Sequence, residues 1–187
     1  FFSLVAIYFF IEKKYYISGI FLGVAFMAKF FQLFIFIAII FITLLNFDAK
    51  SVRNLKKIFI GFIVVTALFL ILNQILYNNI FFPFIQQIFL SNNSGWLNYH
   101  SFSYYFIELF KENLVYLLFV FGLFLLFKDK DANKKLIAII FLLFFIFFNS
   151  IKQKEMRFLI VLFPYMYLLI SFSVIYILNN FKNKISK

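Results

Sequence analysis

Residues 136–148 read Leu-Ile-Ala-Ile-Ile-Phe-Leu-Leu-Phe-Phe-Ile-Phe-Phe, a stretch without one polar side chain. A transmembrane strand would alternate apolar and polar residues over about ten positions, and this stretch shows no alternation. It therefore predicts a helix. A short apolar run fits the core of a soluble protein as well as a membrane, so the rest of the chain decides which environment holds this helix.

The composition of the whole chain is that of a membrane protein. Apolar residues make up 65% of its 187 residues, and 35 residues are Phe. An ordinary soluble domain is about 45–50% apolar even when glycine is included. A soluble domain of this length would expose large apolar patches if it carried so many large apolar side chains. The composition therefore excludes a soluble globular protein.

Seven apolar segments follow one another along the chain, separated by polar gaps. One helical crossing of a bilayer takes about 20 residues, so some segments are long enough and others are short. We expect an all-α, polytopic integral membrane bundle of about six or seven transmembrane helices, in a single domain over residues 1–187. The segments are Phe1–Ile11, Tyr15–Ala28, Phe30–Leu45, Ile58–Tyr77, Leu114–Phe127, Leu136–Phe148 and Phe158–Leu178.

The first of these segments is too short to cross a membrane alone. Phe1–Ile11 covers 11 residues, which is about half of one crossing. It also lacks the charged start and the cleavage site of a signal peptide. We interpret it as the end of a longer helix, and we expect the chain to be the C-terminal part of a longer protein.

The excess of positive charge is located in the gaps between apolar segments. The chain carries 18 Lys and Arg against 7 Asp and Glu, a balance that in a soluble protein would indicate nucleic-acid binding. Short basic gaps between apolar runs instead orient a membrane protein. We therefore expect membrane lipids as partners and no nucleic acid. With no Cys and one His, the chain offers no disulfide, and no metal site is expected.

Counting basic residues in the gaps predicts the orientation of the helices. The gaps 46–57 and 128–135 carry four Lys or Arg each, and the tail after residue 178 carries three. All three are therefore expected on the cytoplasmic side. The long stretch 78–111 carries only Lys111, and we expect it to be an outer loop.

The gap 151–157 is an exception to this charge rule. Parity makes it a short outer loop, although it carries Lys152, Lys154 and Arg157. Cations kept on the outer side indicate an anionic partner there. Arg157 precedes the last apolar segment, and the start of a helix attracts anions, so Arg157 and Lys154 are candidate phosphate ligands supported by Lys152. The alternative is a solvated interfacial turn whose Lys side chains reach the lipid headgroups.

The same segment carries a family resemblance. Lys154-Glu155-Met156-Arg157-Phe158, followed by Pro164, resembles the His-Lys-Glu-x-Arg-Phe segment, with a downstream Pro, of membrane mannosyltransferases of the Alg9 and PIG-B type. These enzymes belong to the GT-C glycosyltransferase superfamily. The usual His is Gln153 in this chain. Glu155 either holds Arg157 in place or accepts a hydrogen bond from a sugar hydroxyl, and the alternative is a simple ion pair.

Two weaker resemblances precede it along the chain. The stretch from Tyr99 to Tyr105 is similar in place and aromatic character to a Tyr-Gly-x-x-Pro-Trp-x-x-Tyr stretch of those enzymes, without its Gly, Pro and Trp. Aromatic faces stack on sugar rings, while amides and imidazole bind hydroxyls, although an aromatic belt at the membrane interface is an equal alternative. The candidate sugar contacts are Trp96, Asn98, Tyr99, His100, Tyr104 and Tyr105.

The third resemblance begins at Gly19 and ends at Lys29. Its Gly-x-x-x-Gly-x-Ala-x-x-x-Lys pattern is similar to a segment found across GT-C enzymes, including the protein mannosyltransferase and aminoarabinose transferase branches. The glycines also fit plain close packing of two helices. Lys29 is a further candidate phosphate ligand, provided that residues 15–45 form two short helices and expose it on the outer side. One long helix would bury it instead.

The resemblance implies a GT-C-like fold and a membrane glycosyltransferase without a separate cofactor. Such an enzyme transfers a sugar, here a hexose such as mannose, from a polyprenyl-phosphate donor to a lipid-linked or glycan acceptor at the outer or lumenal face. It acts in a bacterial or archaeal cytoplasmic membrane, or in the endoplasmic reticulum of a eukaryote. The family places a general-base Asp near the N-terminus, and we expect this Asp upstream of the chain, because the Asp residues present lie in gaps predicted to be cytoplasmic.

Two other classes of protein remain open at this point. A transporter would need polar residues along its midplane helices and often two repeated halves, and apart from Lys29 the apolar segments are nearly free of charge. A non-enzymatic multipass subunit of envelope polysaccharide assembly fits the composition equally well. It leaves the outward basic gap without an explanation.

Overall fold

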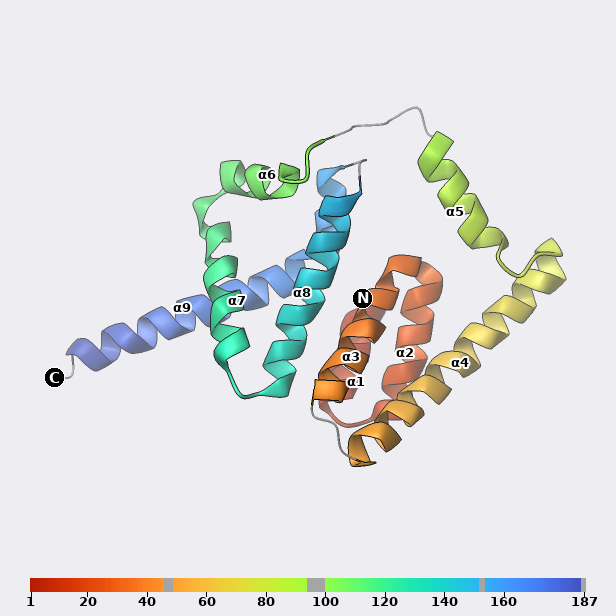
Figure 1. Ribbon diagram of the computed structural model, residues 1–187, viewed down its shortest axis with the longest axis horizontal. Coiled ribbons are helices and arrows are strands. Elements are labelled where there is room, and N and C mark those ends of the chain that lie inside the picture. The colour runs from red at the N-terminus through yellow and green to blue at the C-terminus, as the bar shows by residue number, and fades with distance from the viewer. Residues whose placement is uncertain (46–48, 94–99, 152–153, 186–187) are drawn as a thin grey trace. The chain divides into compact units, whose positions relative to one another are not determined.

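The computed structural model describes residues 1–45, 49–93, 100–151 and 154–185, and their regular secondary structure is helical throughout (Figure 1). The all-α bundle predicted from the apolar segments is confirmed. The chain forms two compact units, Phe1–Trp96 and Leu97–Lys187. That both units belong to one transmembrane domain stays a prediction.

The first unit is built around a close pair of helices. Its elements are α1 (Phe2–Ile11), α2 (Tyr15–Ala28), the 3₁₀ turn η1 (Phe30–Gln32), α3 (Leu33–Leu45), α4 (Ala49–Tyr77) and α5 (Phe82–Asn93). The helix α2 packs along α4, and glycines form the contact. A Cβ atom added at Gly19 would lie 2.1 Å from the carbonyl oxygen of Ile58, and one at Gly61 would lie 2.4 Å from that of Tyr16. Only glycine lets the two backbones approach this closely.

The predicted segment 15–45 is two helices and not one. The break falls at Lys29, whose backbone is extended with φ −155° and ψ 120°, and η1 then leads into α3. Figure 1 shows that the chain reverses direction between α2 and α3, which are joined at one end. Lys29 is exposed at this break. Of the two arrangements that the sequence allowed, the structure therefore has the one that exposes Lys29.

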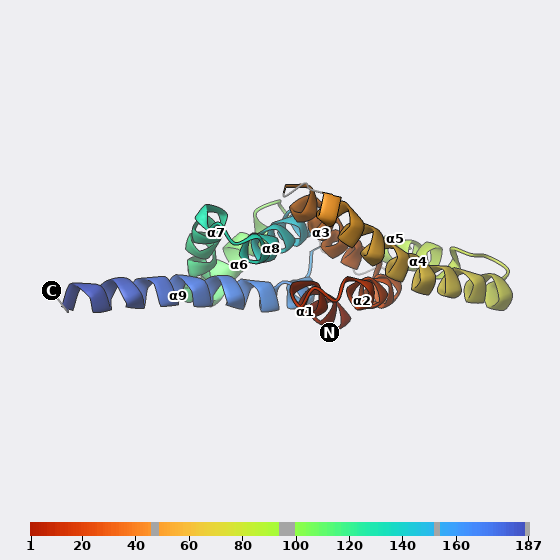
Figure 2. The same cartoon turned by 90° about the horizontal axis from the view of Figure 1, so that it is seen from below.

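The second unit contains α6 (Tyr104–Glu112), the 3₁₀ turn η2 (Leu114–Leu117), α7 (Leu118–Lys128), α8 (Ala132–Ser150), the 3₁₀ turn η3 (Met156–Val161) and α9 (Phe163–Ile185). Figure 2 shows α7 and α8 on the same side of α9. The buried residues of α8 include four at a spacing of four, which forms one face of a helix. They are Leu136, Ile140, Phe144 and Phe148.

Small side chains again bring two helices together in the second unit. A Cβ atom at Gly122 of α7 would lie 2.1 Å from the carbonyl oxygen of Leu169 in α9. One turn further along α9, the Ser173 hydroxyl donates a hydrogen bond of 2.7 Å to the carbonyl of Leu118. Pro164 is the second residue of α9, and because it has no N–H group the helical ladder of η3 cannot continue through it.

The apolar segments and the helices agree closely along the chain. Each predicted segment overlaps a helix or a 3₁₀ turn that leads into one, but α4 begins at Ala49, nine residues before the predicted Ile58, and so includes the basic residues of the gap 46–57. Among the residues that the structure describes, two helices are long and apolar enough, by length and composition, to cross a membrane: α4 with 29 residues and α8 with 19. The stretch 78–111, predicted as an outer loop, contains the helices α5 and α6 in addition, and on which side of the membrane it lies stays a prediction.

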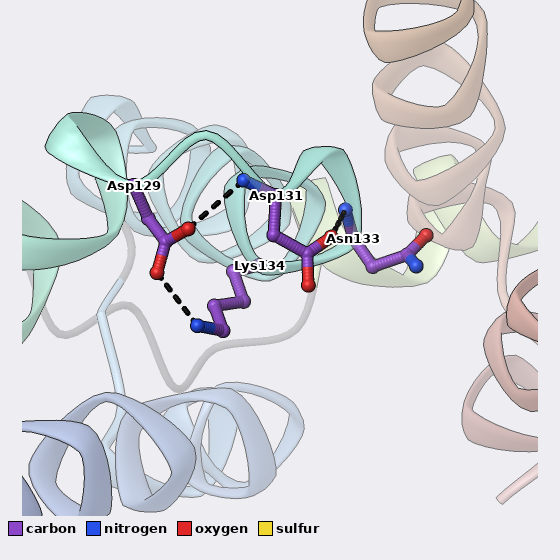
Figure 3. A network of polar contacts seen from close by, with 4 residues as sticks. All are labelled: Asp129, Asp131, Asn133 and Lys134. Atoms are coloured by element: carbon purple, nitrogen blue, oxygen red, sulfur yellow. Dashed lines mark hydrogen bonds and ion pairs between the residues drawn. The ribbon is translucent and has the colours of Figure 1, made fainter.

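The turn between α7 and α8 is held by its own polar residues (Figure 3). Asp131 caps α8 by accepting a hydrogen bond of 2.9 Å from the backbone N–H of Asn133. The Asp129 carboxylate accepts from the backbone N–H of Asp131 at 2.9 Å and pairs with Lys134 at 2.6 Å. The ammonium of Lys134 lowers the pKa of Asp129, and the carboxylate raises the pKa of Lys134. Both aspartates therefore have a structural role in this turn.

Candidate functional site

Two segments that are about fifty residues apart in the sequence meet in the second unit. The first is the aromatic segment 100–105, which leads into α6, and the second is the basic segment 154–157, which leads into η3. The ammonium of Lys154 donates to the backbone carbonyl of His100 at 3.3 Å. The Tyr105 hydroxyl contacts the backbone of Glu155. The structure therefore brings together the two stretches that separately resemble the mannosyltransferases.

Tyr105 makes the firmest of these contacts. Its hydroxyl donates to the carbonyl oxygen of Glu155 at 3.2 Å and accepts from the N–H of the same residue at 3.1 Å. The side chain is 0% exposed. Burial raises the pKa of Tyr105 to about 12, so the hydroxyl keeps its proton at neutral pH and remains a donor. Because it is enclosed, Tyr105 presents no surface to a sugar, and its position indicates a role in holding the segment 154–157.

Lys154 is a buried cation. It is 2% exposed, and its ammonium donates to the backbone carbonyls of His100 and Ile151. Burial lowers the pKa of Lys154, since removal from water disfavours the charged form. Carbonyl dipoles satisfy hydrogen bonds but do not neutralise a charge, so a positive charge at this position is costly to keep. Buried ionisable groups of this kind are typical of functional sites.

Arg157 is the exposed cation of the segment. Its side chain is 69% exposed, and its guanidinium pairs with the Glu155 carboxylate through Nη2 at 3.0 Å and also through Nε. The guanidinium lies 5.8 Å from the ring centre of Phe158, and that ring stacks on Phe148 of α8. An arginine has five N–H donors, so three remain available after the contact with Glu155. Arg157 is the second residue of η3, slightly later than the position before the helix that the sequence predicts.

The aromatic segment carries a stacked pair at its start. The rings of His100 and Tyr104 are 3.9 Å apart at their centres and nearly parallel, with an angle of 16° between them. His100 is exposed and Tyr104 is half-buried. Of the candidate sugar contacts that the structure describes, these two retain surface that a sugar ring can reach.

The remaining candidates belong to the first unit or lie outside the described residues. Lys29 belongs to the first unit, where its ammonium lies 5.7 Å from the ring centre of Phe31. Trp96, Asn98, Tyr99 and Lys152 lie outside the described residues.

The aspartates of the α7–α8 turn lie far from the basic segment. Asp129 and Asp131 are at the start of α8, whereas Lys154 follows its end. A helix of 19 residues is about 28 Å long, so these carboxylates do not act at the basic segment. Asp48 lies outside the described residues. The general base expected from the resemblance is therefore not supplied by Asp129 or Asp131.

The role of Tyr105 is the feature that sequence reasoning missed. The aromatic stretch predicts sugar contacts, and nothing in the spacing of Tyr104 and Tyr105 separates an exposed ring from a buried one. The spacing within α6 gives no signal either, because Tyr105 with Leu109 and Phe106 with Phe110 are both apolar pairs four residues apart. Only the structure shows that the first pair is buried and the second is exposed.

Comparison with known proteins places the chain in a family. The Alg9-like mannosyltransferase family matches residues 2–186, which is nearly the whole chain and includes both segments of the candidate site. No curated protein and no solved structure matches the chain. The helical structure with membrane-spanning lengths in α4 and α8 agrees with a membrane enzyme. The chain thus belongs to the Alg9-like mannosyltransferase family, and the protein is a membrane glycosyltransferase.

Proposed function

We propose that the protein transfers a hexose such as mannose from a polyprenyl-phosphate donor to a lipid-linked or glycan acceptor at the outer or lumenal face of the membrane. The observation that carries the proposal is the contact between segments 100–105 and 154–157. This contact joins cations suited to a phosphate with aromatic and imidazole groups suited to a sugar.

Arg157 is the proposed ligand of the donor phosphate. As the glycosidic bond breaks, negative charge develops on the departing lipid phosphate, so a fixed cation stabilises the transition state more than the ground state. The free donors of Arg157 grip two phosphate oxygens, while Glu155 orients the guanidinium from the other side. Lys154 contributes its charge from the interior, where the low dielectric strengthens it. Lys152 completes the proposed cationic segment.

The stacked pair of His100 and Tyr104 is the proposed sugar contact. Its outer ring face suits the apolar face of a hexose, and the imidazole nitrogens bind hydroxyl groups. Trp96, Asn98 and Tyr99 precede the pair in the sequence and are proposed to extend this contact.

The proposal is tested by measuring which sugar donor the protein uses. Membranes that contain the full-length protein are supplied with a radiolabelled hexose on polyprenyl phosphate, or with the same hexose on a nucleotide. Labelled glycan or glycolipid is expected from the first donor alone. If transfer requires the nucleotide-linked sugar in membranes that cannot convert it to the lipid-linked form, the proposed donor is wrong.

Labelling of single cysteines tests the proposed side of the membrane. The chain has no Cys, so Ser101→Cys and Asn133→Cys each create one reactive site, on the aromatic segment and in the α7–α8 turn. We expect Ser101→Cys to react with a membrane-impermeant thiol reagent in intact cells, and Asn133→Cys to react only after permeabilisation, because the basic turn is cytoplasmic. The reverse labelling pattern would contradict a phosphate site on the outer side of the membrane.

Substitution of Lys29 tests the third proposed phosphate ligand. Lys29 is exposed at the break between α2 and α3, and we propose that it lies on the outer side of the membrane and contributes to binding of the donor phosphate. Lys29→Met should lower the rate of transfer while the amount of folded protein stays the same. Lys56→Met, which removes another exposed lysine of the first unit, is the control with wild-type transfer. Greater thermal stability of Lys29→Met with unchanged transfer would exclude a functional role.

A further inference from the structure

Two buried residues, Tyr105 and Lys154, hold the basic segment 154–157, and we call them its anchor. They support an inference beyond the choice of substrate. Tyr105 bonds both the N–H and the C=O of one residue, Glu155, and it does so from a different helix. A side chain that bonds both groups of one peptide residue fixes that residue in position and in orientation. The Glu155 carbonyl also accepts from the backbone N–H of Phe158 at 3.0 Å, so the hydroxyl adds to that bond and gives the Glu155 N–H a partner as well.

Lys154 holds the neighbouring residue of the same segment. Its ammonium binds the carbonyl of His100, five residues before Tyr105. Two consecutive residues of the basic segment are thus attached to one short aromatic segment. Ile151, at the end of α8, provides a further carbonyl for the same ammonium. Lys154 and Glu155, which lead into η3, therefore have a defined position.

The Glu155 side chain links this fixed backbone to the exposed guanidinium of Arg157. The Glu155 backbone is held by Tyr105, and the Glu155 carboxylate pairs with Arg157 at two points. Stability alone does not require a lysine at position 154, because an apolar side chain there would avoid the cost of a buried charge. A buried charge at Lys154, close in sequence to the exposed Arg157, therefore indicates a function that depends on the position of Arg157.

We propose that Tyr105 is a positioning residue, which together with Lys154 fixes the Glu155 backbone and so sets the place of the Arg157 guanidinium. The proposal rests on the phosphate-binding role given to Arg157 above, and it adds which residues determine that role. Tyr105 touches neither donor nor acceptor. It acts through Glu155 and Arg157.

The anchor itself is tested without any measurement of sugar transfer. Met156→Cys gives the full-length protein a single, half-buried cysteine in the middle of the segment, and its rate of reaction with a maleimide in detergent reports how often the segment opens. Tyr105→Phe keeps the ring and removes both hydrogen bonds to Glu155. We expect labelling to be about tenfold faster in the Tyr105→Phe background, as the loss of two ordinary hydrogen bonds predicts.

Tyr165→Phe is the matched control for this experiment. Tyr165 is a tyrosine of the same unit, buried to 2% exposure, and it lies in α9, where its ring stacks on Phe144 of α8. Labelling of Met156→Cys should keep its original rate in this background. If Tyr105→Phe fails to give folded protein, Lys154→Met takes its place, because it removes the bond to His100 along with a buried charge. Faster labelling is expected there too. An unchanged rate in the folded variant would overturn the anchor.

A double-mutant cycle separates positioning from general stability. If Tyr105 acts through Arg157, then Tyr105→Phe with Arg157→Lys should transfer sugar no more slowly than Arg157→Lys alone. A purely structural Tyr105 would instead give losses that multiply, which would overturn the positioning role. Faster labelling with full transfer in Tyr105→Phe would overturn the positioning role, and the transfer rate of Arg157→Lys alone would then decide whether the phosphate role of Arg157 stands. The failure of the further inference and the failure of the proposed function are thus distinguishable.

Discussion

Arg157→Lys is expected to slow sugar transfer by one to two orders of magnitude while the protein remains folded. Lysine keeps the charge but presents a single ammonium, so it cannot bind Glu155 and two phosphate oxygens in one plane. Loss of a charge-assisted hydrogen bond costs about 1.5–3 kcal/mol, which corresponds to roughly one to two decades in rate. Because the contact strengthens as the phosphate departs, the loss should appear in kcat and only weakly in the KM of the donor.

The chain offers a matched control for this substitution. Arg53, on α4 in the first unit, is its other arginine and is also exposed. Arg53→Lys should transfer at the wild-type rate in membranes with matched amounts of protein. Equal rates for Arg157→Lys and the wild type would contradict the phosphate grip and favour a solvated interfacial turn at 151–157.

Gly19→Ala is expected to be the most damaging single-methyl change in the first unit. The added Cβ would lie 2.1 Å from the carbonyl oxygen of Ile58 and 3.0 Å from its Cα, and a backbone atom cannot rotate away as a side chain can. The helices α2 and α4 must therefore separate, which costs about 2–3 kcal/mol as overpacking. The measurement is the thermal unfolding temperature in detergent, which should fall by several degrees.

Gly23→Ala, one turn further along the same helix, is the control. Its added Cβ would meet the Phe62 carbonyl oxygen at 3.1 Å and the Val65 side chain at 3.1 Å. Small shifts of a few tenths of an ångström relieve these contacts, so the loss of stability should stay below about 1 kcal/mol. Similar unfolding temperatures for the two variants would show that α2 and α4 do not pack through Gly19 in the membrane.

Much of the candidate site follows from local pattern in the sequence. The family resemblance and the outward basic gap both indicate residues 154–157, and the family match over residues 2–186 confirms the membership. Two features did not follow from that pattern. The helices α5 and α6 lie in a stretch whose low charge predicts an outer loop, because charge counting reports on topology and carries no information about local helices. The sequence did not decide whether the chain breaks at Lys29, because an apolar run of this length fits one helix or two.

The sequence by itself determined the membrane environment, the helical class and the order of the apolar helices, but not their limits, since α4 begins nine residues before and α9 ends seven residues after the predicted segment. The excess of apolar residues and the placement of the charges can be read directly from the sequence. They determine insertion into the bilayer and orientation in it, independently of how the helices pack against one another. Only the tertiary structure decided that Lys154 is buried while Arg157 is exposed, and that Tyr105 holds Glu155 across fifty residues of chain. These facts depend on how α6 packs near the end of α8. Such contacts join residues that no local spacing relates, and their energy is gained only after the helices have met.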